Sequence, residues 1–273
     1  MSFYGLREDA DYRIMMDHLS ALQKLFSDTG VPSFFSDNLV AINRNLTFLY
    51  DEKFMNAFKA ATQGGTEADE AKLWRLHTLA WCGQTALYIP GDFVECGVYK
   101  GLYSGMLTDY LDWSTIDRRF YLYDTFAGLP DDWSTERERA GVNDVYEWDG
   151  TYEKVCERFA KYPNVDVIKG VVPDIFEETS PKKIALLHLD LNAAQAEVAA
   201  LDALKSRLSN GAIVLMDDFA RKEQLALAEA LMEWWLVHDH HILELPTGQG
   251  MVTVNAAKLQ EIDLKMKGKG KTV

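Results

Sequence analysis

Three aspartates in the second half of the chain stand where acidic side chains could act together. Asp190 follows the apolar segment 184–189, and Asp217 and Asp218 follow a second apolar segment at 213–216. If both segments are parallel strands, their carboxyl ends share one edge of the sheet and the carboxylates converge. Like charges so close repel, which raises their pKa values unless a cation neutralises them. A divalent ion with oxygen ligands would supply this cation, so a Mg²⁺ site is predicted. The alternative is a structural role, in which Asp218 caps a helix and Asp190 forms a turn.

A glycine-containing turn follows an earlier apolar segment at 93–96. It runs ECGVYKG from Glu95 to Gly101, with Gly97 where glycine lets the backbone come close to a ligand. The pattern is not GxGxxG, and a carboxylate beside the turn would repel a pyrophosphate. The acid suits a ligand with an ammonium or sulfonium group, such as S-adenosylmethionine. The alternative is a turn that serves only packing.

Two further strand ends could complete a nucleoside pocket. Asp124 ends the segment 120–123 and could accept hydrogen bonds from both ribose hydroxyls of an adenosine, or else be an N-cap or turn residue. Gly170 and Val171 follow the segment 165–168 and form a small-residue turn with room for an adenine ring.

The elements around these residues alternate between strand and helix from residue 91 onward. Such alternation predicts a parallel sheet covered on both faces, with helices near 101–112, 152–161, 194–208 and 219–237. The segments 241–245 and 251–254 predict an antiparallel hairpin at one sheet edge. Residues 1–90 show only helical periodicity, with helices over 12–26, 54–61 and 71–88 and no strand; Thr66 and Asp69 form a capping-box pattern.

The composition excludes several classes of protein. With 28 Lys and Arg against 42 Asp and Glu, the net charge of the 273 residues is −14, which gives no general attraction to nucleic acid or to anionic membranes. No apolar stretch is long enough for a membrane-spanning helix, and early charges argue against a signal peptide. Three cysteines without a CxxC pair suggest neither a disulfide framework nor a zinc site. A cytoplasmic protein is expected.

Five motifs in order resemble the macrocin O-methyltransferase (TylF) family of class I S-adenosylmethionine-dependent methyltransferases. They are FVECGVYKG, YLYDTFAGLP, HLDLN, LMDDFA and LPTGQG, spread over about residues 90–254. The resemblance implies a Rossmann-like α/β fold with a mostly parallel seven-stranded sheet and helices on both faces. It divides the chain into an N-terminal helical extension (1–90), a methyltransferase domain (91–256) and a C-terminal helix end with a basic tail (257–273).

The resemblance also assigns roles to residues. The ion would bind two neighbouring oxygens of a hydroxylated small molecule, such as a sugar or another natural product, and direct one of them at the methyl group. The metal ligands would be Asp190, Asp217 and Asp218, and Asp190 could also take the proton. The cofactor pocket would comprise Glu95, Cys96, Gly97, Tyr99, Gly101, Asp124, Thr125, Phe126, Gly170 and Val171.

This chain departs from the family pattern after the fourth strand. The family has DxDxY followed by a Ser/Thr pair, whereas this chain has Asp190-Leu191-Asn192-Ala193-Ala194. This departure leaves open a methyltransferase-like module that binds the cofactor without catalysis. The shared α/β plan and Asp124 leave open an NAD(P)-dependent oxidoreductase.

Three other features have alternative interpretations. The segment 130–150 contains Trp133, Tyr146 and Trp148, lacks clear periodicity and could cover a site. His188 is expected to be a core histidine rather than a base. The N-terminal extension could be a lid over the site. Alternatively it could be a dimer surface, and the chain would then form a homo-oligomer.

Overall fold

The computed structural model describes residues 10–269. A seven-stranded sheet forms the centre, in the order β5-β4-β3-β6-β7-β9-β8. The first five strands in this order are parallel, whereas β9 is antiparallel to both β7 and β8. The strands are β3 (Asp92–Cys96), β4 (Phe120–Asp124), β5 (Val165–Lys169), β6 (Ile184–Leu189), β7 (Leu208–Met216), β8 (Leu243–Glu244) and β9 (Gly250–Thr253). The predicted fold class and the edge hairpin are confirmed.

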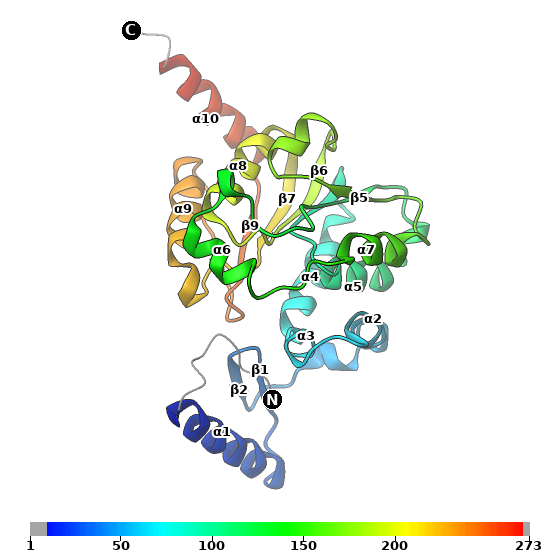
Figure 1. The fold of residues 1–273 in the computed structure, drawn as a ribbon, viewed down its shortest axis with the longest axis vertical. Coiled ribbons are helices and arrows are strands. Elements are labelled where there is room, and N and C mark those ends of the chain that lie inside the picture. The colour runs from blue at the N-terminus through cyan, green and yellow to red at the C-terminus, as the bar shows by residue number, and fades with distance from the viewer. Residues whose placement is uncertain (1–9, 270–273) are drawn as a thin grey trace.

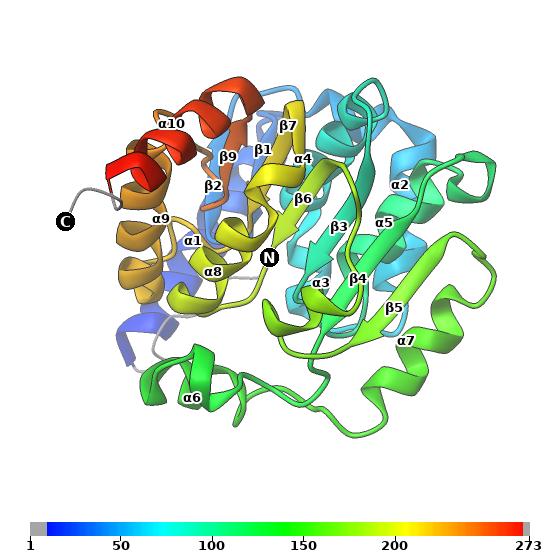
Figure 2. The ribbon, with the colours of Figure 1, turned by 90° about the horizontal axis from the view of Figure 1, so that it is seen from above.

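Helices cover both faces of the sheet, which explains why its central strands are nearly continuous apolar runs. One face packs against α4 (Leu73–Ala86), α5 (Leu102–Tyr110) and α7 (Thr151–Phe159), and α2 (Glu52–Thr62) packs on α4 and α5 in the same core. The other face packs against α8 (Ala194–Leu204), α9 (Leu225–Val237) and α10 (Ala256–Lys269). Figure 2 shows the two groups of helices on opposite sides of the sheet. Trp234 and Trp235 lie in the second core, as predicted.

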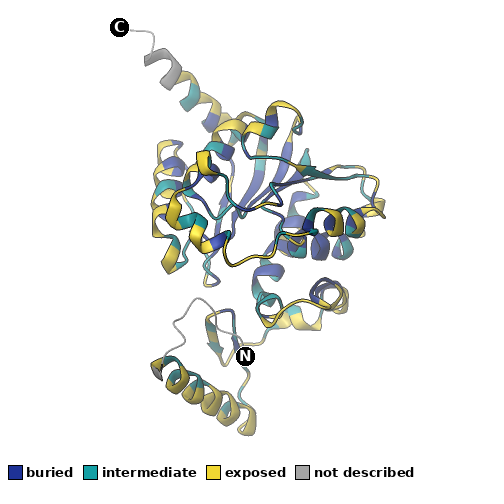
Figure 3. Cartoon of the chain, viewed as in Figure 1, coloured by how far each residue is buried: buried dark blue, intermediate teal, exposed yellow. Residues whose placement is uncertain are grey.

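The N-terminal segment contains a β-hairpin that the sequence did not predict. Helix α1 (Ala10–Asp28) is followed by β1 (Ser33–Ser36) and β2 (Leu39–Ile42), which pair antiparallel. The prediction of helices alone before residue 90 is therefore wrong. The strands are too short to show a period, and their two-residue turn, Asp37-Asn38, has positive φ at both positions. In Figure 1 this segment lies below the main body, and Figure 3 shows α1 as largely exposed.

Two other segments refine the predictions. Helix α3 (Glu67–Ala71) begins with the predicted capping box between Thr66 and Asp69. The segment 130–150 is not a plain loop, because it contains α6 (Glu136–Val142), which also begins with a capping box.

At the C-terminus α10 projects from the body (Figure 1), while the end of the predicted basic tail lies outside the described residues. Among residues 10–269, no helix is both long and apolar enough to cross a membrane.

Candidate active site

The strand ends on the α4 and α5 side of the sheet carry a buried polar network. Glu95 and His188 are register partners on β3 and β6, so their side chains lie side by side. His188 Nδ1 lies 3.0 Å from Glu95 Oε1, and its Nε2 lies 3.8 Å from Asp217 Oδ1. Burial lowers the pKa of His188, but Asp217 and Glu95 outweigh it and raise the pKa to about 10. A protonated imidazolium cannot act as a base, which agrees with a core role for His188.

Asp217 is held by three donors from three other parts of the chain. Its Oδ2 accepts hydrogen bonds from Arg75 Nη1 at 2.8 Å and from the Tyr103 hydroxyl at 2.9 Å. Its Oδ1 accepts one from Gln249 Nε2 at 2.8 Å. Burial would raise the pKa of Asp217, but Arg75 and His188 lower it well below its usual range. Asp217 is therefore ionised at neutral pH and is held by donors of the chain itself.

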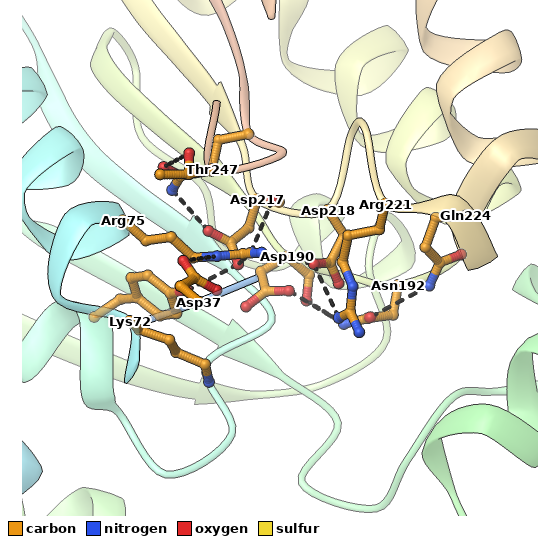
Figure 4. Close-up of polar contacts among 12 residues, drawn as sticks. Asp37, Lys72, Arg75, Asp190, Asn192, Asp217, Asp218, Arg221, Gln224 and Thr247 are labelled. Atoms are coloured by element: carbon orange, nitrogen blue, oxygen red, sulfur yellow. Dashed lines mark hydrogen bonds and ion pairs between the residues drawn. The ribbon is translucent and has the colours of Figure 1, made fainter. Parts of the chain in front are cut away.

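Arg75 connects this network to the N-terminal hairpin. It comes from α4 and is 3% exposed. Its Nε donates to Asp37 Oδ2 at 2.9 Å, and its Nη1 lies 3.4 Å from Asp218 Oδ1. Figure 4 shows the guanidinium between the carboxylates of the hairpin tip and of the β7 end. Neither Arg75 nor Asp37 was predicted from the sequence as a site residue.

Asp190 and Asp218 lie beside this network and face other partners. Asp190 Oδ1 accepts a hydrogen bond from Asn192 Nδ2 at 3.1 Å, and Asp218 Oδ1 pairs with Arg221 Nη1 at 3.2 Å. Burial raises the pKa of Asp190, and the negative charges of Asp217 and Asp218 raise it further. As a residue Asp190 is half-buried, whereas Asp217 and Asp218 are buried.

The three acids do not fit the predicted magnesium site. Among the described residues, no group of three or more His, Cys, Asp or Glu side chains is arranged to hold a metal ion. The reason lies in Asp217, whose two oxygens already accept hydrogen bonds from chain donors, and in Arg75 and Arg221, whose positive charges oppose part of the negative charge of the acids. The prediction of a three-acid site is not confirmed.

The glycine turn packs directly against Asp190. Gly97 has φ of 89°, and a Cβ at this position would lie 2.0 Å from the backbone oxygen of Asp190. The Asp190 N–H donates to the Cys96 carbonyl at 2.8 Å, which keeps the two strand ends together. Only glycine allows this approach, so the absence of a side chain at Gly97 is what lets the turn lie against Asp190.

Asp124 organises the same turn. Its Oδ2 accepts hydrogen bonds from the backbone N–H groups of Val98 and Tyr99, both at 2.7 Å, and its Oδ1 accepts one from Phe126 N at 2.6 Å. The carboxylate thus fixes the loop that connects β3 to α5. The structure shows this turn-forming role directly, and the ribose contact stays a prediction.

The remaining predicted cofactor residues divide into turn and core positions. Gly101 is the N-cap of α5 with φ of 71°, and Thr125 Oγ1 donates to the Gly128 carbonyl at 2.6 Å. Gly170 and Val171 follow β5, where the Gly170 N–H donates to the Asp124 carbonyl at 2.9 Å. Two side chains are core residues, Phe126 in the α5 face and Cys96 in the α8 face of the sheet.

Aromatic rings stand over the glycine turn. The Tyr99 ring lies 4.9 Å from Tyr146 and 5.3 Å from Trp148, measured between ring centroids. Burial raises the pKa of Tyr146 to about 12, and the charges of Asp190 and Asp218 contribute. The segment 130–150 therefore reaches the acids, as a covering segment must.

Three site residues were missed although the sequence contained signals for them. Gln249 belongs to the LPTGQG motif, and its Oε1 accepts a hydrogen bond from Thr247 Oγ1 at 2.9 Å, which aims Nε2 at Asp217. Arg75 lies on the buried face of α4, where a charge needs a partner. Tyr103 follows the glycine turn on α5.

Comparisons with known proteins point to one family. A family model described as macrocin-O-methyltransferase (TylF) matches residues 71–239. A Streptomyces olivaceus protein named 8-demethyl-8-(2,3-dimethoxy-alpha-L-rhamnosyl)-tetracenomycin-C 4'-O-methyltransferase is 31% identical over 163 residues, which cover 54% of this chain and 61% of that protein. The chain spans about three fifths of the length of the curated relatives it matches.

Solved structures share the fold. The O-methyltransferase NovP aligns with a TM-score of 0.54 and 22% identity, covering 66% of this chain and 79% of that one. The SAH-bound Podospora anserina methyltransferase PaMTH1 aligns with a TM-score of 0.50 and 14% identity, covering 93% of this chain and 99% of that one. At these identities the likeness establishes the architecture alone.

Proposed function

The chain belongs to the macrocin O-methyltransferase (TylF) family, and on this premise we propose that it transfers a methyl group from S-adenosylmethionine to a hydroxyl oxygen of a small molecule. The observation that carries the proposal is the contact between Gly97 and Asp190. Gly97 lies against the backbone of Asp190, so a cofactor bound at this turn would lie next to the acid, as methyl transfer to a hydroxyl requires.

The residues around the turn fit this cofactor. Glu95 is 1% exposed, and its Oε2 is a buried oxygen without a hydrogen-bond partner. Such an oxygen is costly unless a donor reaches it, and the ammonium group of the methionine portion would be that donor. Gly97 and Gly101 would border this portion, and Asp124 would hold the ribose. When bound, the cofactor supplies an electrophilic methyl group on its sulfonium.

Asp190 would take the proton of the acceptor hydroxyl. A general base works best when its pKa lies near the working pH, and Asp190 has its pKa raised by burial and by its acidic neighbours. Asn192 Nδ2 donates to Asp190 Oδ1 and holds the carboxylate in place. The second oxygen, Oδ2, would face the acceptor. Because a magnesium ion does not fit the three acids, no step is routed through a metal.

The acceptor would be a hydroxylated natural product, and a sugar is the first choice. The Streptomyces olivaceus relative is named for methylation of a rhamnosyl-bearing compound, which supports this class. The rings of Tyr99, Tyr146 and Trp148 would form the apolar side of the acceptor site. The nonpolar C–H face of a sugar ring suits such a surface.

The proposed domains follow the fold. Residues 91–256 would form the methyltransferase domain, residues 1–90 an extension that reaches the site through Asp37, and residues 257–273 a C-terminal helix end and tail. The family match begins at residue 71, so α4 is counted with the family region although it precedes the sheet.

The test separates cofactor binding from turnover. S-adenosylhomocysteine should raise the midpoint of thermal unfolding by several degrees at about 100 times its Kd. Incubation with S-adenosylmethionine and rhamnose-bearing glycosides should then release S-adenosylhomocysteine, and Asp190→Asn should keep the thermal shift and lose turnover. Binding without methylation of any hydroxylated acceptor would favour a non-catalytic module. Tighter binding of NAD(H) than of S-adenosylhomocysteine would favour an oxidoreductase.

A further inference from the structure

The strand-end acids have a cation of their own. The Arg75 guanidinium lies 2.9 Å from Asp37, 2.8 Å from Asp217 and 3.4 Å from Asp218, measured between nitrogen and oxygen. All four side chains are at most 5% exposed. A guanidinium stays protonated at any pH at which the protein is folded. The negative charge that would attract a divalent ion is thus already opposed from inside the molecule.

The hydrogen bonds of Asp217 lead to the same conclusion. A carboxylate has about four positions that can accept a hydrogen bond or bind a metal ion. Arg75, Tyr103 and Gln249 occupy three of them, and His188 Nε2 lies 3.8 Å from Oδ1 near the fourth. A metal ion at Asp217 would either have to enter the one position left, beside the His188 ring, or displace a buried donor, which would then be left without a partner.

The orientation of Arg75 is set by the N-terminal hairpin. Asp37 lies at the hairpin tip with φ of 54° and accepts the hydrogen bond from Nε, which fixes the plane of the guanidinium. Ser36 Oγ donates to the Ala71 carbonyl at 3.3 Å and ties the same tip to the end of α3. With Nε held by Asp37, Nη1 points at Asp217 and at its backbone oxygen, 3.1 Å away. The hairpin thereby becomes part of the site.

We propose that Arg75, oriented by Asp37, is the built-in counter-ion of the acid cluster and stands in place of a divalent metal. Arg75 is a positioning residue, since it acts through Asp217 and Asp218 and not on the acceptor. The consequence for turnover, that methyl transfer needs no divalent ion, rests on the proposed function. The proposal also implies that the cluster has no affinity for Mg²⁺ or Mn²⁺ while Arg75 is present. This second consequence does not depend on the proposed function.

The decisive experiment is a titration of the full chain with Mn²⁺, followed by electron paramagnetic resonance, and with Mg²⁺, followed by calorimetry. We expect no saturable site in the wild type and none in Arg75→Lys, which keeps a positive charge. In Arg75→Met, Asp37 and Asp217 lose the arginine between them while Arg221 still pairs with Asp218. A saturable Mn²⁺ site should then appear, because buried carboxylates that have lost their cation gain a partner. Arg13→Met on exposed α1 removes the same charge elsewhere and should leave Mn²⁺ binding unchanged.

The outcomes distinguish this proposal from the proposed function. One Mn²⁺ per wild-type chain, lost in Asp217→Asn, would overturn the role of Arg75 whether or not the protein methylates anything. Should Arg75→Met fail to fold, the wild-type titration and Arg75→Lys still decide the question. Absence of methyl transfer together with a metal-free wild type would refute the enzyme but retain Arg75 as counter-ion. If an acceptor is found, equal rates in EDTA and in Mg²⁺ are expected.

Discussion

Glu197 should make the stability of this fold depend on pH. Its side chain lies on α8, 1% exposed, with Oε1 accepting a hydrogen bond from the Leu191 N–H at 3.2 Å and Oε2 buried without a partner. Burial raises its pKa from an ordinary 4.5 to about 8, and the charges of Asp190 and Asp218 add to the effect. This carboxyl is therefore protonated in the folded chain at neutral pH.

The direction of the change in stability with pH depends on whether the folded or the unfolded state holds the proton. Between about pH 4.5 and 8 the folded state keeps a proton on Glu197 that the unfolded state has lost. The stability due to this proton is complete below the unfolded pKa and is lost as the pH rises to the folded pKa. The free energy of unfolding should fall by up to about 1.4 kcal/mol for each pH unit in this window.

The variant Glu197→Gln removes the titration and keeps an oxygen for the Leu191 N–H. Between about pH 6 and pH 8, the wild type should lose roughly 2–3 kcal/mol that the variant does not lose. For a chain of this size that amounts to roughly 5–10 °C in the midpoint of unfolding. Thermal melts followed by circular dichroism across this range measure the difference directly.

A matched control is Glu229→Gln, because Glu229 is exposed on α9 and undergoes the same chemical change at the surface. Its melting profile should run parallel to that of the wild type. If the Glu197→Gln profile also runs parallel, the buried carboxyl is not protonated in the folded state and the reasoning from burial is refuted.

Changes at the strand ends should have separable effects. Gly97→Ala should abolish the thermal shift with S-adenosylhomocysteine, since its Cβ would meet the Asp190 backbone, whereas Gly141→Ala, with open space around its Cβ, should retain it. Asp190→Asn should lower methyl transfer by about 100-fold or more in a coupled S-adenosylhomocysteine assay. The wild-type rate should rise with pH through the raised pKa of Asp190. Tyr103→Phe should cost about 1–2 kcal/mol in urea unfolding and leave cofactor binding intact, because it removes only one donor to Asp217.

The central sheet could be predicted because its strands are buried on both faces. The segments 120–123 and 184–189 are short runs rich in aromatic, β-branched and other apolar residues, each followed by an acid, as expected of strands buried on both faces. Their carboxyl ends then had to meet at one edge, so the proximity of Asp190 to Asp217 and Asp218 followed from topology. Such an argument needs no knowledge of side-chain contacts, which explains why it succeeded.

Segments stabilised by local hydrogen bonds were harder to predict. Helix α6, with the sequence ERERAGV, has almost no apolar periodicity. Its N-terminus nevertheless carries the pattern Thr135-x-x-Glu138, and both capping hydrogen bonds are formed. The hairpin at residues 33–42 has a weaker sequence signal, because its strands have four residues each and its turn is Asp-Asn instead of the commoner Asn-Gly.

Arg75 marks the boundary of what the sequence could yield. Its position on the buried face of α4, in line with Leu79, indicates a buried charge that must have an acidic partner. Its partners Asp37 and Asp217 are 38 and 142 residues away, and no local pattern selects them. Repulsion among the acids at the strand ends requires a nearby cation. That requirement is met by a guanidinium from the chain. Electrostatics determines that a positive charge is present, and only the tertiary fold determines which group carries it.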